Sequence, residues 1–196
     1  MTSFNERWDF ALKASKRPVV QNRNELEHIF NMIKLRGAKS YLEIGTAEGL
    51  TAYVLAGALD ACSRIVCVDF CEPHCEATRT LLLNKLEMEG HSVMMYKGNS
   101  RNPEVVSEVS RSVYDVVLID GDHTFEGVKA DTINYAHLAN KYVFWHDVIA
   151  CTSVANYISL MNDTFNSTVY FDPDGNHLAV MGPERVYGYA IKEIRI

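Results

Sequence analysis

The sequence has little of what marks a membrane, secreted or nucleic-acid-binding protein. No apolar run approaches the ~20 residues of a membrane-spanning helix, so we expect no membrane partner. The first residues, Met-Thr-Ser-Phe-Asn-Glu-Arg, contain no apolar signal core, so we expect a cytoplasmic protein. The 19 Lys and Arg residues are outnumbered by 25 Asp and Glu residues, whereas duplex-binding proteins carry a basic excess. We therefore expect no nucleic-acid partner.

Cysteine is also scarce, and its pattern is not that of a disulfide or zinc scaffold. The five cysteines are Cys62, Cys67, Cys71, Cys75 and Cys151. Their odd number and the missing signal core predict reduced thiols. Cys71, His74 and Cys75 lie close together, but no second cysteine pair follows them to complete a zinc site. We interpret them as the start of a helix after a strand.

The 196 residues, of which 47% are hydrophobic, are enough for one domain with a full core. No internal repeat, low-complexity stretch or linker divides them, so residues 1–196 are expected to form a single domain. Apolar residues at helical spacing predict helices over 3–14 and 24–35. Residues 1–36 would thus form an N-terminal helical cap.

Downstream of this cap, buried strands alternate with helices. The predicted strands are Ser40–Ile44, Arg64–Asp69, Val93–Tyr96, Asp115–Ile119 and Lys141–Trp145. The predicted helices are Leu50–Leu59, Glu72–Glu89, Asn102–Val109, Phe125–Leu138 and Ser153–Met161. This alternation predicts an α/β fold with a doubly wound, mostly parallel sheet.

The C-terminal part changes character. Ser167–Phe171, His177–Met181 and Gly188–Ile194 are predicted as strands, joined by turns at Asp172-Pro173-Asp174-Gly175 and Gly182-Pro183. We expect an antiparallel hairpin at the end of the sheet.

A glycine loop follows the first predicted strand, in the segment Glu43-Ile44-Gly45-Thr46-Ala47-Glu48-Gly49. Its Gly-x3-Gly spacing differs from the Gly-x-Gly-x2-Gly of dinucleotide sites, where a helix N-terminus holds a pyrophosphate. Glu43 and Glu48 place negative charge beside the loop, which suits a positively charged ligand better than a phosphate. Asp69 ends the second strand, where a carboxylate can accept ribose hydroxyls. S-adenosylmethionine matches these requirements, and a nicotinamide dinucleotide is the disfavoured alternative.

Together with this loop and Asp69, Gly98-Asn99-Ser100 and Asp120-Gly-Asp122-His123 resemble the motifs of class I S-adenosylmethionine-dependent methyltransferases. The segment 118–131 resembles a small-molecule O-methyltransferase subgroup that includes the cephalosporin-hydroxylase-type and macrolide-sugar methyltransferases. The resemblance covers about residues 21–148. It implies a Rossmann-like, seven-stranded sheet whose last strand is reversed.

The resemblance also implies roles for individual residues. Gly45 and Gly49 would shape the methionine pocket, with Thr46 in the same cofactor-binding loop and Glu43 supporting it. Asp69 would bind the ribose, Asn99 and Ser100 would lie near the adenine, and Asp120 would lie beside the methionine end and the substrate.

Acidic and histidine residues follow the fourth and fifth predicted strands. Because adjacent strands lie ~4.8 Å apart, Asp120 and Asp122 can converge with His146 and Asp147. Either a histidine base or a divalent metal can activate a hydroxyl, and both remain open. We predict His123 as the general base, assisted by Asp120, with a pKa near working pH.

The metal alternative places Mg²⁺ or another divalent cation on Asp120, His146 and Asp147. Metal-dependent relatives use an acidic residue after the fourth strand and an acidic pair after the fifth, so His146 departs from the pattern.

The predicted function is S-adenosylmethionine-dependent O-methylation of a small-molecule hydroxyl. The alternative is a non-catalytic module that binds S-adenosylmethionine or a partner. Because the sequence holds no large insertion to cover the substrate, we expect a partly open pocket, or one that a second subunit of a homo-oligomer completes.

Overall fold

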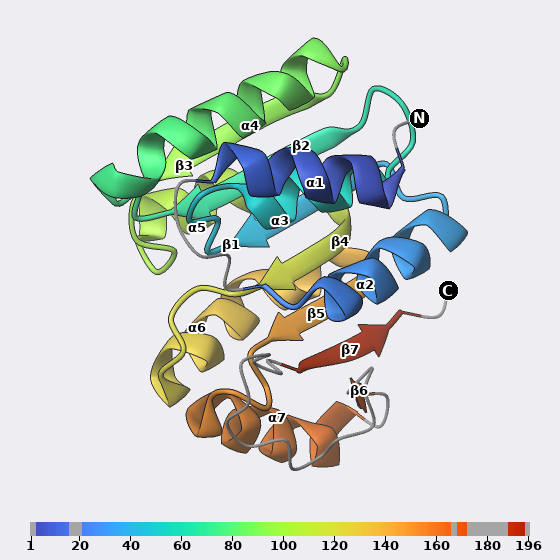
Figure 1. Cartoon of the computed structure of the whole chain (residues 1–196). Helices are drawn as coiled ribbons and strands as arrows, with labels where there is room; N and C mark the ends of the chain where they lie inside the picture. The colour runs from blue at the N-terminus through green and yellow to red at the C-terminus, as the bar shows by residue number, and fades with distance from the viewer. Residues whose placement is uncertain (1–2, 16–20, 166–167, 172–187, 195–196) are drawn as a thin grey trace.

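A mostly parallel β-sheet forms the centre of the computed structural model, which describes residues 3–15, 21–165, 168–171 and 188–194 (Figure 1). Its strands are β1 (Ser40–Ile44), β2 (Arg64–Asp69), β3 (Ser92–Lys97), β4 (Tyr114–Ile119), β5 (Ala139–His146), β6 (Thr168–Phe171) and β7 (Tyr189–Glu193). The sheet order is β3-β2-β1-β4-β5-β7-β6. Strands β1 to β5 are parallel, and β7 is antiparallel to both β5 and β6.

The predicted Rossmann-like α/β fold with an antiparallel C-terminal pair is therefore confirmed. The predicted strand His177–Met181 and its neighbouring turns lie outside the described residues. The strand order reverses direction between β1 and β4, so the carboxyl ends of these two strands border the crevice in which open α/β sheets bind ligands.

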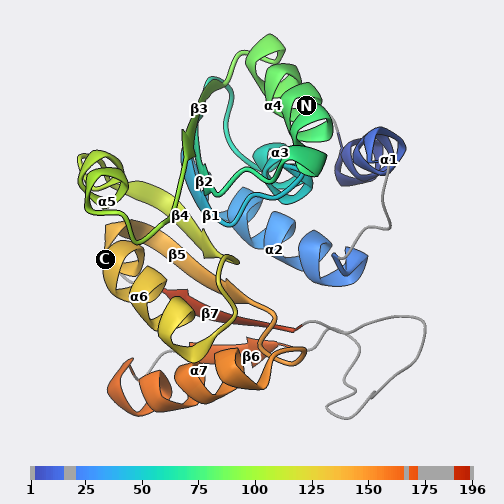
Figure 2. The same ribbon diagram turned by 90° about the vertical axis from the view of Figure 1, so that its left-hand side faces the viewer.

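Helices cover both faces of the sheet (Figure 2). One side carries α1 (Phe4–Ala14), α2 (Arg23–Leu35), α3 (Leu50–Ala56) and α4 (Glu76–Met88). The other side carries α5 (Pro103–Val109), α6 (Phe125–Tyr135) and α7 (Thr152–Phe165). Two 3₁₀ turns, η1 (Pro73–Cys75) and η2 (Ala136–Leu138), precede α4 and follow α6.

Alternate residues of each central strand pack into the two apolar core layers, one on each face of the sheet. In β1, Tyr41 packs with the α1–α4 layer and Leu42 with the α5–α7 layer, and both are fully buried. Burying one such apolar side chain stabilises the fold by about 1.5–3 kcal/mol.

Among the described residues, no helix has the length and apolar character needed to cross a bilayer.

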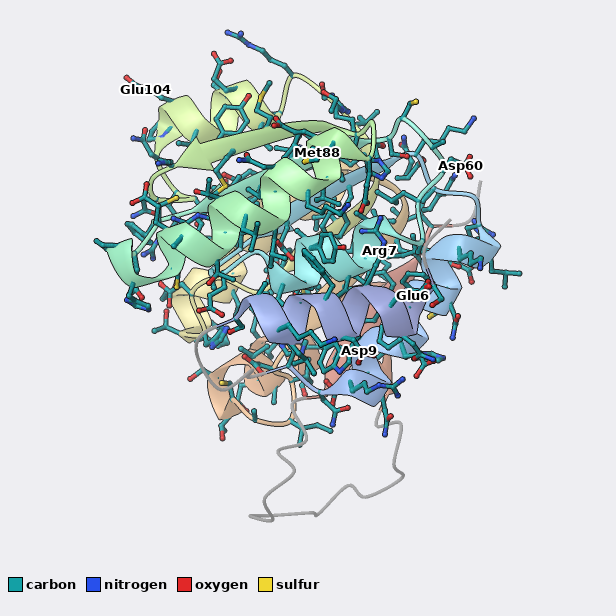
Figure 3. All side chains as sticks on the ribbon, turned by 45° about the horizontal axis from the view of Figure 1, so that its top comes forward. Glu6, Arg7, Asp9, Asp60, Met88 and Glu104 are labelled. Carbon is teal, nitrogen blue, oxygen red and sulfur yellow. The ribbon has the colours of Figure 1, made fainter. Side chains whose placement is uncertain are left out.

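The N-terminal helix α1 is tied to the helices beneath it by one buried cation. The Arg7 guanidinium donates to the Tyr53 carbonyl of α3 at 2.7 Å and pairs with Glu89 after α4. Figure 3 labels Arg7 on α1. A Cβ on Gly57 would lie 2.4 Å from the Arg7 side chain, so glycine makes room for this contact. Helix α1 thus packs on the main core.

Several predicted boundaries need correction. The helix predicted over Glu72–Glu89 begins at Glu76, the one predicted over Phe125–Leu138 ends at Tyr135, and the one predicted over Ser153–Met161 spans Thr152–Phe165. The helix predicted over Leu50–Leu59 ends at Ala56, and Gly57 begins a run of turns. The strand predicted over Lys141–Trp145 spans Ala139–His146, because β4 and β7 pair with it on both sides and Tyr189 of β7 stands opposite His146. His146 is therefore the last residue of β5, whereas it was expected to follow the strand.

Candidate active site

A cavity of about 1080 Å³ lies at the carboxyl ends of the parallel strands. Of the residues predicted for cofactor, base or metal, those that line it are Gly45, Thr46, Asp69, Asn99, Ser100, Asp120, His123, His146 and Asp147. Glu43 and Gly49 are not part of its wall. The structure therefore brings nearly all of the predicted site residues to one cavity.

Gly45 is required by the protein backbone. Its φ is +90°, and a Cβ at this position would lie 2.1 Å from the backbone oxygen of Asp120. The Asp120 amide donates to the Ile44 carbonyl at 2.8 Å, so the carboxyl ends of β1 and β4 are joined by a backbone hydrogen bond. The missing side chain of Gly45 thus makes room for the loop after β4, and Gly45 also lines the cavity, so its place in a cofactor-binding loop stays a prediction.

Gly49 has a separate requirement. It is the N-cap of α3 with a φ of +79°, in the left-handed region that favours glycine. Its amide donates to the Thr46 carbonyl at 2.7 Å, which closes the loop. Gly49 thus shapes the loop from outside the cavity wall.

Glu43 lies beneath the loop. Its side chain is fully buried and accepts a hydrogen bond from the Tyr41 hydroxyl at 2.9 Å. Burial raises the pKa of Glu43 to about 8, so the neutral carboxyl predominates at pH 7. The expectation that Glu43 places a negative charge beside the loop is corrected.

Asp69 ends β2 and joins two loops. One carboxylate oxygen accepts the Ala47 amide at 2.9 Å, and the other accepts the Cys71 amide at 2.5 Å. The Arg79 guanidinium of α4 lies 3.8 Å from the carboxylate and donates to the Ala47 carbonyl at 2.7 Å. The Asp69 side chain is 14% exposed, so its carboxylate can still meet a ligand in the cavity.

Asn99 and Ser100 form the turn after β3. The Asn99 side-chain oxygen accepts the Arg101 amide at 2.8 Å, and the Ser100 hydroxyl donates to Asp131 at 2.6 Å. Asp131 lies on α6 and is fully buried, and this burial raises its pKa. Asp131 ends the segment 118–131, but no sequence feature indicates a role for it. In the structure it links α6 to the turn after β3.

Two histidines and two aspartates form a cluster at the ends of β4 and β5. His146 Nδ1 lies 3.3 Å from an oxygen of Asp120 and 3.3 Å from one of Asp147. His123 Nε2 lies 3.2 Å from Asp147 and 3.4 Å from Asp120. The predicted convergence of the two strand ends is thus present.

The backbone directs one of these carboxylates. Asp147 has a φ of +59°, a left-handed conformation that aspartate adopts more readily than most residues. The chain therefore turns sharply after His146, and the Asp147 carboxylate lies beside the rings of His123 and His146.

The aspartates and histidines of the cluster shift one another's pKa values. Burial disfavours ionisation of Asp120, but the two histidines outweigh it and keep its pKa below the usual range. Burial likewise disfavours a charged His146, yet Asp120 and the other neighbouring carboxylates hold its pKa well above normal. The hydrogen bond to Asp120 raises the pKa of His123, against a smaller opposing effect of burial.

The N-terminal part of the chain contributes two residues that sequence reasoning missed, one just before α2 and one on it. Gln21 donates to Asp120 at 3.2 Å, and Glu25 of α2 has one oxygen 3.5 Å from His146 Nε2. The signal for Glu25 was available, since it lies one turn before Ile29 and two before Ile33 on the apolar face of α2. A carboxylate in such a stripe is rarely buried without a partner.

Asp120, His146 and Asp147 offer three potential ligand atoms that all lie within 4.8 Å of one another. Asp147 Oδ1 is buried and, among the described residues, accepts no hydrogen bond of good geometry. His123, Asp147 and Cys151 form a second, overlapping group. These residues fit a divalent cation, because carboxylate oxygens and an imidazole nitrogen are common metal ligands.

Solved structures resemble this chain closely in fold and distantly in sequence. The O-methyltransferase TomG from Streptomyces achromogenes, involved in tomaymycin synthesis, superposes with a TM-score of 0.75 at 16% identity over 97% of this chain and 90% of its own. An O-methyltransferase from Bacillus cereus gives 0.71 at 14% identity over 98% and 90%. The methyltransferase PaMTH1 from Podospora anserina gives 0.69 at 16% identity over 98% and 88%. At these identities the likeness establishes the fold.

The family comes from the sequence comparison. No curated protein sequence matches the chain significantly. The model of a methyltransferase domain matches residues 42–148, just over half of the chain, from within β1 to just beyond His146 and Asp147. The matched segment contains most of the cavity wall described above. The chain therefore belongs to this methyltransferase domain family.

Proposed function

We propose that the chain is an S-adenosylmethionine-dependent methyltransferase that O-methylates a hydroxyl group of a small molecule. The observation that carries this proposal is one cavity with Asp69 on its wall and the His123 cluster beside it. Solved relatives support the cofactor, because the TomG structure holds S-adenosylmethionine and the Bacillus cereus structure holds S-adenosylhomocysteine.

The residues present fit this cofactor. Asp69 offers a carboxylate at the end of β2, where it can accept hydrogen bonds from the hydroxyls of a ribose. Asn99 and Ser100 border the cavity after β3, and Gly45, Thr46 and Asp120 border it between β1 and β4. When bound, S-adenosylmethionine supplies a methyl group activated by a positively charged sulfur.

His123 is the proposed base. Its side chain is 41% exposed and lines the cavity, while its Nε2 lies beside Asp120 and Asp147. The two carboxylates orient the ring and stabilise the imidazolium that forms when it takes the acceptor proton. Asp120 therefore assists His123 and borders the methionine end of the cofactor site.

Metal assistance is the second part of the proposal. Asp120, His146 and Asp147 would hold a divalent cation such as Mg²⁺. When bound, the cation would supply Lewis acidity to the acceptor oxygen. Two of these three residues, Asp120 and Asp147, also contact His123, so a general base and a cation would lie side by side at the acceptor.

The proposal is tested first by binding. Calorimetry should show that S-adenosylhomocysteine binds, that NAD⁺ does not compete with it, and that Asp69→Ala weakens the complex. Preferred binding of NAD⁺ would overturn the assignment of the cofactor. Tight binding of S-adenosylhomocysteine, with no methyl transfer to any of a panel of hydroxylated acceptors, would favour the non-catalytic alternative.

The base is tested by kinetics once an acceptor is found. We expect His123→Ala to lower kcat by about 10²–10⁴-fold, because that is the usual contribution of a positioned base. Affinity for S-adenosylhomocysteine should stay unchanged. His137→Ala, at an exposed position after α6, is the matched control. Full activity in the His123 variant would contradict the role.

A further inference from the structure

Beyond the proposed function, on which this inference rests, we infer that the Asp120–His146–Asp147 site is built for a transition-metal ion of the Co²⁺, Fe²⁺ and Zn²⁺ class in preference to Mg²⁺, and that Glu25 is the positioning residue that aims His146 at the ion.

The first argument is the chemistry of the donors. His146 presents a nitrogen, and its Nδ1 lies 3.3 Å from an oxygen of each of the two aspartates. Mg²⁺ is held by oxygen ligands, whereas imidazole suits borderline ions such as Zn²⁺ and Fe²⁺. The softer side chains of His123 and Cys151 group with Asp147 next to this set. The nitrogen in place of an oxygen donor therefore shifts the selectivity away from Mg²⁺.

The second argument is the contact that Glu25 makes with the other ring nitrogen of His146. A histidine that binds a metal usually donates its other ring N–H to a carboxylate, which fixes the ring and leaves the opposite nitrogen for the ion. His146 Nε2 faces Glu25 Oε2 at 3.5 Å, and His146 Nδ1 faces the aspartates.

Glu25 is itself held rigidly. It is 1% exposed, and its other oxygen accepts the Gly188 amide at 2.7 Å. Such a buried carboxylate is costly to keep without a partner. Glu25 Oε2 accepts no hydrogen bond of good geometry among the described residues, so we assign the ring N–H of His146, whose Nε2 lies 3.5 Å away, as the partner that would hold it. Helix α2 thus reaches the end of β5 through the Glu25 side chain, whose two oxygens face the Gly188 amide and the ring of His146.

The test measures metal affinity by calorimetry on the full chain without cofactor, with Co²⁺ and Mg²⁺ as probes. Because most protein sites bind Co²⁺ more tightly than Mg²⁺, the ratio of the two affinities is compared between variants. His146→Asp restores an oxygen donor, so we expect the Co²⁺ to Mg²⁺ ratio to fall about 10-fold or more. An unchanged ratio in the folded variant would overturn the inference. His74→Ala controls for uptake by the separate group of Glu72, His74 and Cys75.

Glu25→Gln tests the positioning role. Loss of an outer carboxylate typically weakens metal affinity about 10–100-fold, so Co²⁺ affinity should fall by that factor. In the Co²⁺ protein, the exchangeable imidazole N–H signal shifted by the metal should exchange faster with solvent in this variant, which a loss of stability alone would not produce. Glu27→Gln, on the same helix and exposed, should change neither readout.

A second measurement covers the case in which His146→Asp does not fold. Anomalous scattering from crystals of the wild-type protein grown with Co²⁺ should place the ion between His146 Nδ1 and the two aspartates. Cobalt found only at His74, or bound without His146, would overturn the inference. Binding of S-adenosylhomocysteine is measured on the same samples. If it binds while the ratio is unaltered by His146→Asp, the metal inference alone fails, whereas absent binding counts against the proposed function.

Discussion

Replacing Glu43 by glutamine tests how a buried acid supports the loop after β1. The Glu43 side chain is fully buried, and its carboxyl accepts a hydrogen bond from the Tyr41 hydroxyl at 2.9 Å. Glutamine keeps the shape and the accepting oxygen but cannot ionise. The variant therefore isolates the free energy of ionising this carboxyl.

The magnitude follows from the pKa of Glu43, which burial raises from 4.5 to about 8. Between these values the folded protein keeps a proton that the unfolded chain has released. The stability that the neutral Glu43 carboxyl contributes is fully present below pH 4.5 and is lost as the pH rises through about 8. One pH unit corresponds to about 1.4 kcal/mol, so the wild type should lose about 2–3 kcal/mol relative to Glu43→Gln between pH 5 and pH 7.

Urea unfolding of both proteins at pH 5, 6, 7 and 8 measures this difference, because every other titrating group is common to the two chains. Glu87→Gln, at an exposed position on α4, should show no such trend. If the free energy difference between wild type and Glu43→Gln is the same at pH 5 and pH 7, then Glu43 ionises normally in the folded state and the reasoning is refuted.

Two further substitutions test the walls of the cavity. Gly45→Ala should destabilise the fold by about 3 kcal/mol or more, since its φ is +90° and the new Cβ would lie 2.1 Å from the Asp120 carbonyl oxygen. Gly90→Ala, at φ +91° with nothing within 4 Å, should cost only about 1–2 kcal/mol in urea unfolding, and equal losses would contradict the clash. Asp131→Ala should cost about 1–3 kcal/mol by leaving the Ser100 hydroxyl unpaired, and should weaken binding of S-adenosylhomocysteine in calorimetry. Unaltered binding would contradict a role for Asp131 in holding the turn after β3.

The sheet and the strand ends were predictable because their signals are local. A continuous apolar run such as Val116 to Ile119 is typical of a strand that is buried on both faces of a parallel sheet. Such a sheet binds its ligand at the carboxyl ends of the strands. Asp69 ends β2 and Asp120 follows β4, as predicted. The convergence of the β4 and β5 ends followed from strand spacing alone. These inferences needed only periodicity and topology.

Contacts between distant segments were not predictable. The need for glycine at position 45 comes from the backbone of Asp120, 75 residues downstream, and no local pattern reports such a distance. The burial that neutralises Glu43 depends on how the two core layers close over β1. The approach of Gln21 and Glu25 to the cluster depends on the path of the N-terminal helices, which sequence spacing does not set.

The expectation of a positively charged ligand no longer rests on Glu43, whose carboxyl is largely neutral at pH 7. Glu48 and Asp69 still line the cavity, and further acidic residues lie at the ends of β4 and β5. There Asp120, Asp147 and Glu25 face the imidazoles of His123 and His146. Three carboxylates against two imidazoles leave an excess of negative charge even when both rings are protonated. A sulfonium or a metal ion relieves that excess, and a phosphate increases it, so the same cluster favours the proposed cofactor and disfavours a dinucleotide.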